Sequence, residues 1–188
     1  IAIEQKNTSK NPRSTVATVT EIYDYMRVLY ARAGTPFSPF TGKAITSQTI
    51  TQIVDLVKKL PKKSTIYIYA PVVRGRKGEY KKDILSYKRR GFRKIKIDNV
   101  LYDIEKSPNL DKKFKHDISI LVDRIVLNSK LGNRLAESVE TAVNLSNGLV
   151  FVEYEDETLP QKFRKTEKLI YSTKFACPES GFTIEEIE

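Results

Sequence analysis

The chain has 188 residues, of which 40% are hydrophobic and 30% are charged, as is ordinary for a soluble globular protein. No stretch approaches the roughly 20 apolar residues of a membrane-spanning helix, and no signal peptide is visible. The single cysteine, Cys177, excludes an internal disulfide and is typical of a reducing compartment, so we expect a cytoplasmic location. Because the chain begins with Ile1 rather than methionine, we expect a fragment of a larger protein.

The formal net charge is +10, and it lies almost entirely in residues 74–96. This segment holds eleven Lys or Arg against two acidic residues, which leaves the rest of the chain close to neutral. Such a cluster attracts phosphate, with an affinity that falls as salt rises. We expect five of its cations to bind DNA: Arg74, Arg76, Lys77, Lys81 and Lys82. The alternative is a solvated surface that only keeps the domain soluble.

Two helices are predicted near the start of the chain. Thr18 and Glu21 have the spacing of a capping box in front of an apolar helical stripe, which Gly34 ends. A second amphipathic helix is expected from about Ser47 until Pro61 stops it.

The middle of the chain predicts β structure around one short helix. Residues 65–73 are rich in β-branched and aromatic side chains and predict a strand. Residues 80–90 predict a helix that overlaps the basic segment. Residues 92–98 and 100–104 predict a hairpin that turns at an Asp-Asn pair.

Residues 117–153 predict the unit around which the fold is built: a strand, a helix and a second strand, typical of a βαβ unit. The apolar face of the helix is predicted from its three- and four-residue spacings: Leu131, Leu135, Val139, Ala142 and Val143. Residues 169–173 predict a last short strand. The expected fold class is therefore α/β (α+β), a mixed sheet with packed helices.

Polar residues in this unit are not explained by core packing. Asp123 and Arg124 interrupt an apolar strand, and Arg124 is expected to share the strand face of Ile118 and Ile120. Glu137 lies on the helix face opposite the apolar stripe. Two interpretations stay open: a strand end beside a solvated helix face, or a polar docking surface.

No catalytic residue is predicted. The chain lacks a phosphate-binding loop, and His116 is its only histidine, which argues against a histidine-based triad or metal cluster. The Pro-x-x-Gly texture of residues 39–42 recurs within residues 175–182 and indicates a small helical and turn-rich neck. Residues 45–172 would then be a domain inserted between residues 1–44 and 173–188.

Several motifs, in order along the chain, resemble the UvrA subunit family of the bacterial nucleotide-excision-repair excinuclease. They are IAIEQKNTSKNPRSTV at residues 1–16, APVVRGRKGE at residues 70–79, VDRIV at residues 122–126, RLAESVETA at residues 134–142 and FACP at residues 175–178. The resemblance covers essentially the whole chain, although members of the family are much longer.

The resemblance implies an ABC-type ATPase that uses ATP and Mg²⁺, binds damaged duplex DNA and forms a homodimer. Gln5 falls at the glutamine loop of its first ATPase module, and residues 45–172 fall at the inserted domain that binds UvrB. Arg124 and Glu137 would form the centre of the UvrB contact. Their expected neighbours are Arg134, Glu140 and Asp123. The fragment itself would not be an enzyme.

The resemblance also indicates where a metal site would lie in this family. The family often has a zinc-type Cys spacing in the two neck turns, where this chain has Ser38, Thr41, Cys177 and Ser180. With one thiol among four positions, neither zinc nor another metal is expected. Packing of four phenylalanines would hold the neck instead: Phe37, Phe40, Phe175 and Phe182.

Two other functions remain as alternatives. One is an autonomous basic nucleic-acid-binding module formed by residues 74–96, in which Tyr80, Tyr87 and Phe92 alternate with the charges. The other is a self-contained enzyme, which the absence of any catalytic motif disfavours.

Overall fold

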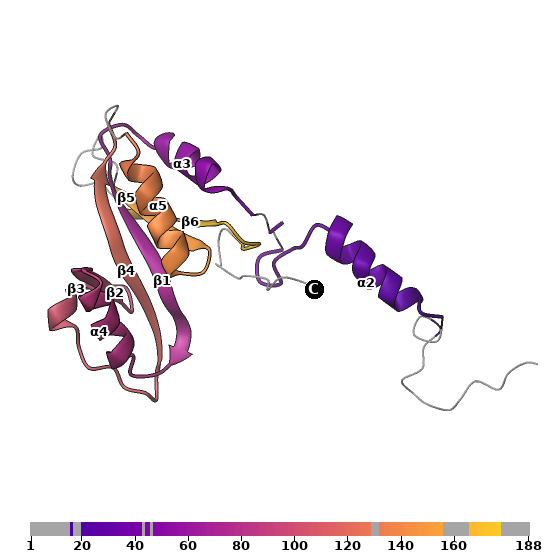
Figure 1. The fold of residues 1–188 in the computed structure, drawn as a ribbon, viewed down its shortest axis with the longest axis horizontal. Coiled ribbons are helices and arrows are strands. Elements are labelled where there is room, and N and C mark those ends of the chain that lie inside the picture. Colours follow the sequence, from indigo (N-terminus) through magenta and orange to yellow (C-terminus); the bar gives the residue numbers. More distant parts are fainter. Residues whose placement is uncertain are drawn as a thin grey trace, which may run out of the picture. The chain divides into compact units, whose positions relative to one another are not determined.

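The computed structural model describes Val16 and residues 20–42, 44–45, 47–128, 132–155 and 166–177. The chain divides into two compact units, Ile1–Pro36 with Glu186–Glu188, and Phe37–Glu185 (Figure 1). The first contains helix α2 (Ile22–Ala33), which ends at Gly34 as predicted. The Thr18 of the predicted capping box lies outside the described residues, and Glu21 is the N-cap without a side-chain hydrogen bond.

The second unit is built on a six-stranded sheet with the order β3-β2-β4-β1-β5-β6. Its strands are β1 (Thr65–Lys77), β2 (Lys94–Ile97), β3 (Val100–Asp103), β4 (Lys115–Val126), β5 (Leu149–Glu155) and β6 (Thr166–Ser172). Its helices are α3 (Ile50–Lys58), α4 (Lys81–Arg89) and α5 (Arg134–Leu145), with the 3-10 turn η1 (Ile104–Lys106). The predicted class, helices packed on a sheet, is confirmed.

Strand direction differs from the prediction in one respect. Every neighbouring pair of strands is antiparallel, so the sheet is not of mixed direction. The predicted βαβ unit nevertheless exists as β4, α5 and β5. Because β4 and β5 both pair antiparallel with β1, they run parallel to each other with β1 between them, as in a split βαβ unit.

Local sequence signals account for several element ends. Thr49 Oγ1 accepts a hydrogen bond from Gln52 N at 3.2 Å, and Gln52 Oε1 accepts from Thr49 N at 2.9 Å, which completes a capping box on α3. The predicted hairpin of β2 and β3 is confirmed. Asp98 and Asn99 have φ values of 48° and 68°, the left-handed conformations that a tight two-residue hairpin turn requires.

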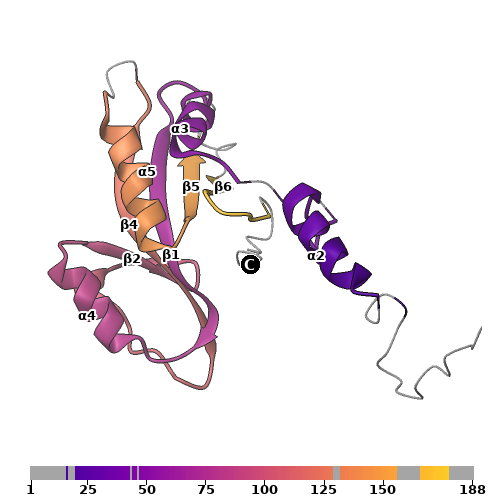
Figure 2. The ribbon, with the colours of Figure 1, turned by 45° about the vertical axis from the view of Figure 1, so that its right-hand side comes forward.

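The core lies between the sheet and helices α3 and α5, which cover the same face (Figure 2). Ile66, Ile68 and Val152 of the sheet are fully buried against Leu135 and Val139 of α5. The predicted apolar stripe of this helix is therefore confirmed where it is described; Leu131 lies outside the described residues. Among the described elements, no helix packs on the opposite face of β1, β4 and β5, which we call the open face.

Candidate functional site

A β-bulge decides where the polar residues of β4 point. Ile68 pairs with Asp123 and Tyr69 pairs with Leu121, so Val122 is left between two paired positions. The extra residue places Asp123 on the helix-covered face and Arg124 beside Tyr67 on the open face. The expected register, in which Arg124 shares a face with Ile118 and Ile120, was wrong for this reason.

Asp123 joins β4 to the first turns of α5. Arg134 donates from Nε to Asp123 Oδ2 at 2.9 Å and from Nη2 to Oδ1 at 2.8 Å, and Ser138 Oγ donates to Oδ2 at 2.9 Å. Burial alone would raise the pKa of Asp123, but the hydrogen bonds from Arg134 and Ser138 outweigh it and hold the pKa below its usual range. The group is thus an ionised clamp that positions α5.

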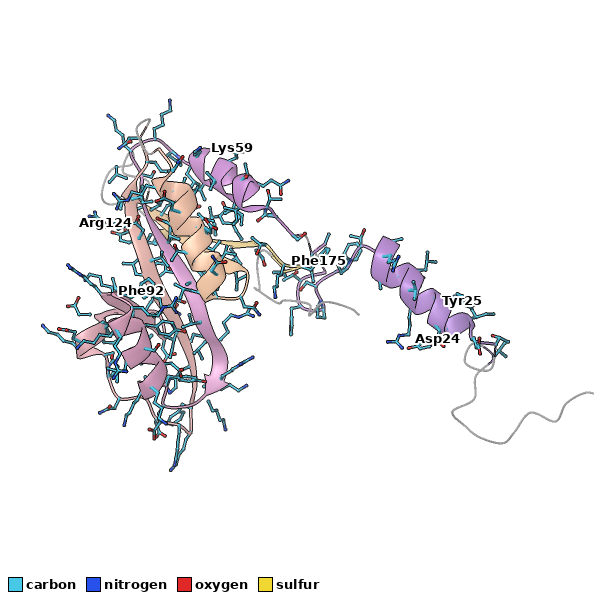
Figure 3. All side chains as sticks on the ribbon, in the orientation of Figure 1. Asp24, Tyr25, Lys59, Phe92, Arg124 and Phe175 are labelled. Atoms are coloured by element: carbon cyan, nitrogen blue, oxygen red, sulfur yellow. The ribbon has the colours of Figure 1, made fainter. Side chains whose placement is uncertain are left out.

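Arg124 has a different environment. Its guanidinium lies 5.7 Å from the ring centroid of Tyr67, and its Nε donates to the Tyr67 hydroxyl at 3.3 Å. The side chain is exposed and forms no ion pair with a carboxylate of the described residues. Arg124 is therefore a cation held in place on the open face, with its charge available to a partner (Figure 3).

Next to it, the open face is hollowed into a cavity of about 540 Å³. Residues of β1, β2, β4, β5 and β6 line it, together with Phe40 of the neck. The centre is an ion pair in which Lys96 Nζ lies 2.5 Å and 2.8 Å from the two carboxylate oxygens of Glu153. Lys96 Nζ also lies 5.2 Å from the ring centroid of Tyr69, which is only 4% exposed. Burial and the charge of Glu153 raise the pKa of Tyr69, so its hydroxyl stays neutral.

A second cation at the cavity is Lys168, which lies opposite Glu153 where β5 pairs with β6. Lys168 Nζ lies 3.8 Å from the ring centroid of Phe151, and no carboxylate of the described chain forms an ion pair with it. Burial lowers the pKa of Lys168 most, and the charge of Lys96 lowers it further, although the charges of Glu153 and Asp117 oppose this. An anionic group entering the cavity would relieve that cost.

Sequence reasoning did not identify this cavity. The sequence did contain a local indication of a polar strand face. Tyr67 and Tyr69 alternate with apolar residues in one predicted strand, and Glu153 interrupts another apolar run. Their convergence with Lys96 and Lys168 depends on a strand order that no local pattern specifies.

The residues expected at one partner contact lie on two surfaces. Glu137 and Glu140 are exposed on the outer side of α5, in the layer that covers the sheet. Arg124 lies on the opposite, open face. The structure therefore brings Asp123 to Arg134, but it does not bring Arg124 and Glu137 to one surface.

The five cations expected to bind DNA are also divided. Arg74 lines the open-face cavity, whereas Arg76 and Lys77 lie at the far end of β1. Lys81 Nζ lies 3.7 Å from Glu79 Oε2. Lys82 is the next residue of α4.

Three of the four neck positions are described, and they supply two hydroxyls and one thiol. Ser38 Oγ accepts from the backbone N–H groups of Phe40 and Thr41, and Thr41 Oγ1 lies 3.3 Å from the buried Cys177 Sγ. Hydroxyls in this arrangement are poor substitutes for thiolates. Within the described residues, no group of three or more His, Cys, Asp or Glu side chains could hold a metal ion. Ser180 lies outside them, as does Gln5.

The predicted phenylalanine packing of the neck was wrong where it is described. Phe37, Phe40 and Phe175 are 62%, 74% and 48% exposed. Backbone pairing of Phe37 with Ala44 and burial of Cys177 join the neck instead. Phe182 lies outside the described residues.

Comparison with known proteins identifies the family. The sequence model described as "UvrA interaction domain" matches residues 48–156. The whole chain is 54% identical to UvrABC system protein A of Bradyrhizobium diazoefficiens, 53% identical to that of Mesorhizobium japonicum and 49% identical to that of Rickettsia typhi. It spans 20% of the length of each relative. In the described part of the chain, no helix is long and apolar enough to cross a membrane. Because the matched segment is more than half of its length, the chain belongs to the UvrA interaction domain family.

Proposed function

We propose that this chain docks UvrB within a UvrA protein of nucleotide excision repair, and that the open face of the sheet is the docking surface. The family match and the UvrABC system relatives support the partner. In the larger protein, ATP and Mg²⁺ would bind to ABC modules, one of which would include Gln5. The chain described here would contribute no catalysis of its own.

The observation that carries this assignment is the exposed charge of Arg124 beside a cavity lined by both apolar and charged side chains. Arg124 and Lys168 form no ion pair among the described residues, whereas Lys96 is neutralised by Glu153. All of them project from strands, which hold side chains more rigidly than loops do. Such a surface favours a partner segment that carries carboxylates next to apolar side chains. Charge complementarity of this kind sets register and selectivity.

The other expected contact residues receive different proposed roles. Asp123 and Arg134 position α5 through their paired hydrogen bonds. Glu137 and Glu140 belong to a second candidate surface on the outside of α5. A single flat partner surface cannot cover both faces of the sheet. Docking on the open face and docking on the outside of α5 therefore predict opposite effects of substituting Arg124 and Glu137.

Calorimetric titration of UvrB into matched variants tests the assignment. We expect Arg124→Ala to weaken binding by tenfold or more, about 1.4 kcal/mol, because it removes a preorganised cation. Glu137→Arg should leave affinity within about twofold of the parent chain. Both side chains are exposed, so circular dichroism should show the parent fold for each.

The reverse result would move the docking surface. If Glu137→Arg weakened UvrB binding while Arg124→Ala did not, the outer face of α5 would be the contact. If neither variant changed the affinity, neither surface would be the centre of the interface.

A further inference from the structure

The far ends of β1 and β4 form a surface that the docking proposal does not use. The two strands pair along their length, as far as Arg76 with His116 and Lys77 with Lys115, and this ribbon extends beyond α5 (Figure 1). The turn before β4 adds two more lysines. We call five exposed cations the basic tip: Arg76, Lys77, Lys112, Lys113 and Lys115.

The basic tip is not neutralised by its surroundings. No carboxylate of the described chain forms an ion pair with any of its five cations. Two aspartates adjoin the tip in sequence and accept hydrogen bonds from backbone groups: Asp111 Oδ1 accepts from Lys113 N at 2.9 Å, and Asp117 Oδ1 accepts from Gly75 N at 2.7 Å. The five cations therefore outnumber these two carboxylates. Lys77 directly opposes Lys115 across the ribbon, and like charges at such positions destabilise a sheet. An anionic ligand would remove this repulsion.

An aromatic side chain lies among these cations. Phe114 is 64% exposed, and its backbone N–H donates to Asp111 O at 3.2 Å, which closes a tight turn. His116, only 8% exposed, contacts the same turn from its buried side. Its Nε2 lies 3.0 Å from Asp111 O, and its Nδ1 lies 2.8 Å from Asp98 Oδ2. The ring of Phe114 is thus presented to solvent by a turn that is already organised.

We propose that the basic tip binds nucleic acid, with its cations on phosphates and the Phe114 ring stacked on an unpaired or unstacked base. One exposed ring among five cations matches the repeating unit of a nucleic acid strand, a planar base between charged phosphates. An anionic membrane would require a broad apolar face, and a protein partner would require a cluster of buried anchors; the tip offers neither. Two of the tip residues, Arg76 and Lys77, were expected to bind DNA from the sequence, whereas Phe114 was not.

The basic tip is far from Arg124, the residue on which the docking proposal depends. Arg124 pairs with Tyr67, ten positions along β1 from Lys77, which is roughly 30 Å at about 3.3 Å per residue. The open-face cavity extends between them, and its lining reaches Arg74, two positions from Arg76. Because Arg124 and the tip lysines are far apart, their contributions to partner docking and to nucleic acid binding can be tested by separate substitutions.

The test is fluorescence anisotropy at low salt, with a labelled single-stranded oligodeoxythymidylate of about 12 nucleotides and a blunt duplex of the same length. The tip variant carries Lys112→Gln, Lys113→Gln and Lys115→Gln. The matched control carries Lys58→Gln, Lys59→Gln and Lys62→Gln, which remove the same charge just before β1 begins. Figure 3 shows the position of Lys59. Circular dichroism and titration with UvrB check that the tip variant keeps its fold and its docking surface.

We expect the parent chain to bind the single strand more tightly than the duplex. The tip variant should lose tenfold or more in affinity. Its plot of log affinity against log salt concentration should have a slope that is shallower by about 2, since each phosphate contact contributes about 0.7 to that slope and three lysines are removed. The control variant should change much less. Phe114→Ala should weaken single-strand binding by about fivefold or more and remove the preference over duplex.

Three results would overturn the proposal. The first is equal loss in the tip and control variants, which would indicate attraction to overall charge. The second is parent-like binding by Phe114→Ala. The third is binding to phosphatidylserine vesicles that depends on Phe114 without any binding to the oligonucleotide, which would make the ligand a lipid surface.

Discussion

The ion pair between Lys96 and Glu153 allows a sharp test of how the open face is held together. Because β4 and β1 lie between β2 and β5, the pair crosses two strands and ties the β2–β3 hairpin to the far half of the sheet. The side chains are 20% and 10% exposed, so both charges are largely removed from water. Removing one partner would leave the other largely buried without the charge that pairs with it.

We expect Lys96→Met and Glu153→Gln each to lower the free energy of unfolding by about 2–4 kcal/mol, near the lower end for a buried pair because some solvent remains. In a chain of this size, that corresponds to a fall in Tm of about 4–16 °C. The double variant with Lys96→Met and Glu153→Gln should lose less than the sum of the two single changes, since neither member of the ion pair is left charged without the other. The expected coupling energy is about 1.5 kcal/mol or more.

Urea unfolding followed by circular dichroism measures these differences. Lys94→Met is the matched control, because Lys94 lies in the same strand and pairs with Asp103 at 3.2 Å with both side chains about half exposed. Its expected cost is at most about 0.5 kcal/mol. Equal costs for Lys94→Met and Lys96→Met, or additive effects in the double variant, would refute the argument that burial makes the Lys96–Glu153 pair strong.

Two further predictions concern pH and are measured by urea unfolding across a pH series. Hydrogen bonds from Arg134 and Ser138 lower the pKa of Asp123, so its contribution to stability is present above the ordinary aspartate pKa and is lost as pH falls through the lowered value; Asp123→Asn should flatten this acid limb. Hydrogen bonds to Asp98 and Asp111 raise the pKa of His116, so its contribution is complete below the ordinary histidine pKa and is lost as pH rises through the raised value. His116→Gln should remove that dependence near neutral pH, and an unchanged pH profile in either variant would contradict the assignment.

The elements that the sequence predicted well are those specified by local chemistry. The end of α2 at Gly34 and the β2–β3 turn at Asp98 and Asn99 depend on residues within a few positions of each other. The apolar stripe of α5 follows from helical spacing alone. The resemblance to the UvrA family also came from the sequence, because ordered motifs need no coordinates, and the family match confirms it.

Only the tertiary structure decided which side chains meet. One unpaired residue, Val122, decides that Asp123 lies on the helix-covered face and Arg124 on the open face, and no period of two in the sequence reveals such a bulge. Lys96 and Glu153 are 57 residues apart and meet because β2 and β5 belong to one sheet. Lys77 and Lys115 likewise share one end of a ribbon although they come from different parts of the chain. Local propensity fixes short-range geometry, whereas strand order and register depend on burial of the whole core, so charges far apart in sequence gather only when the sheet forms.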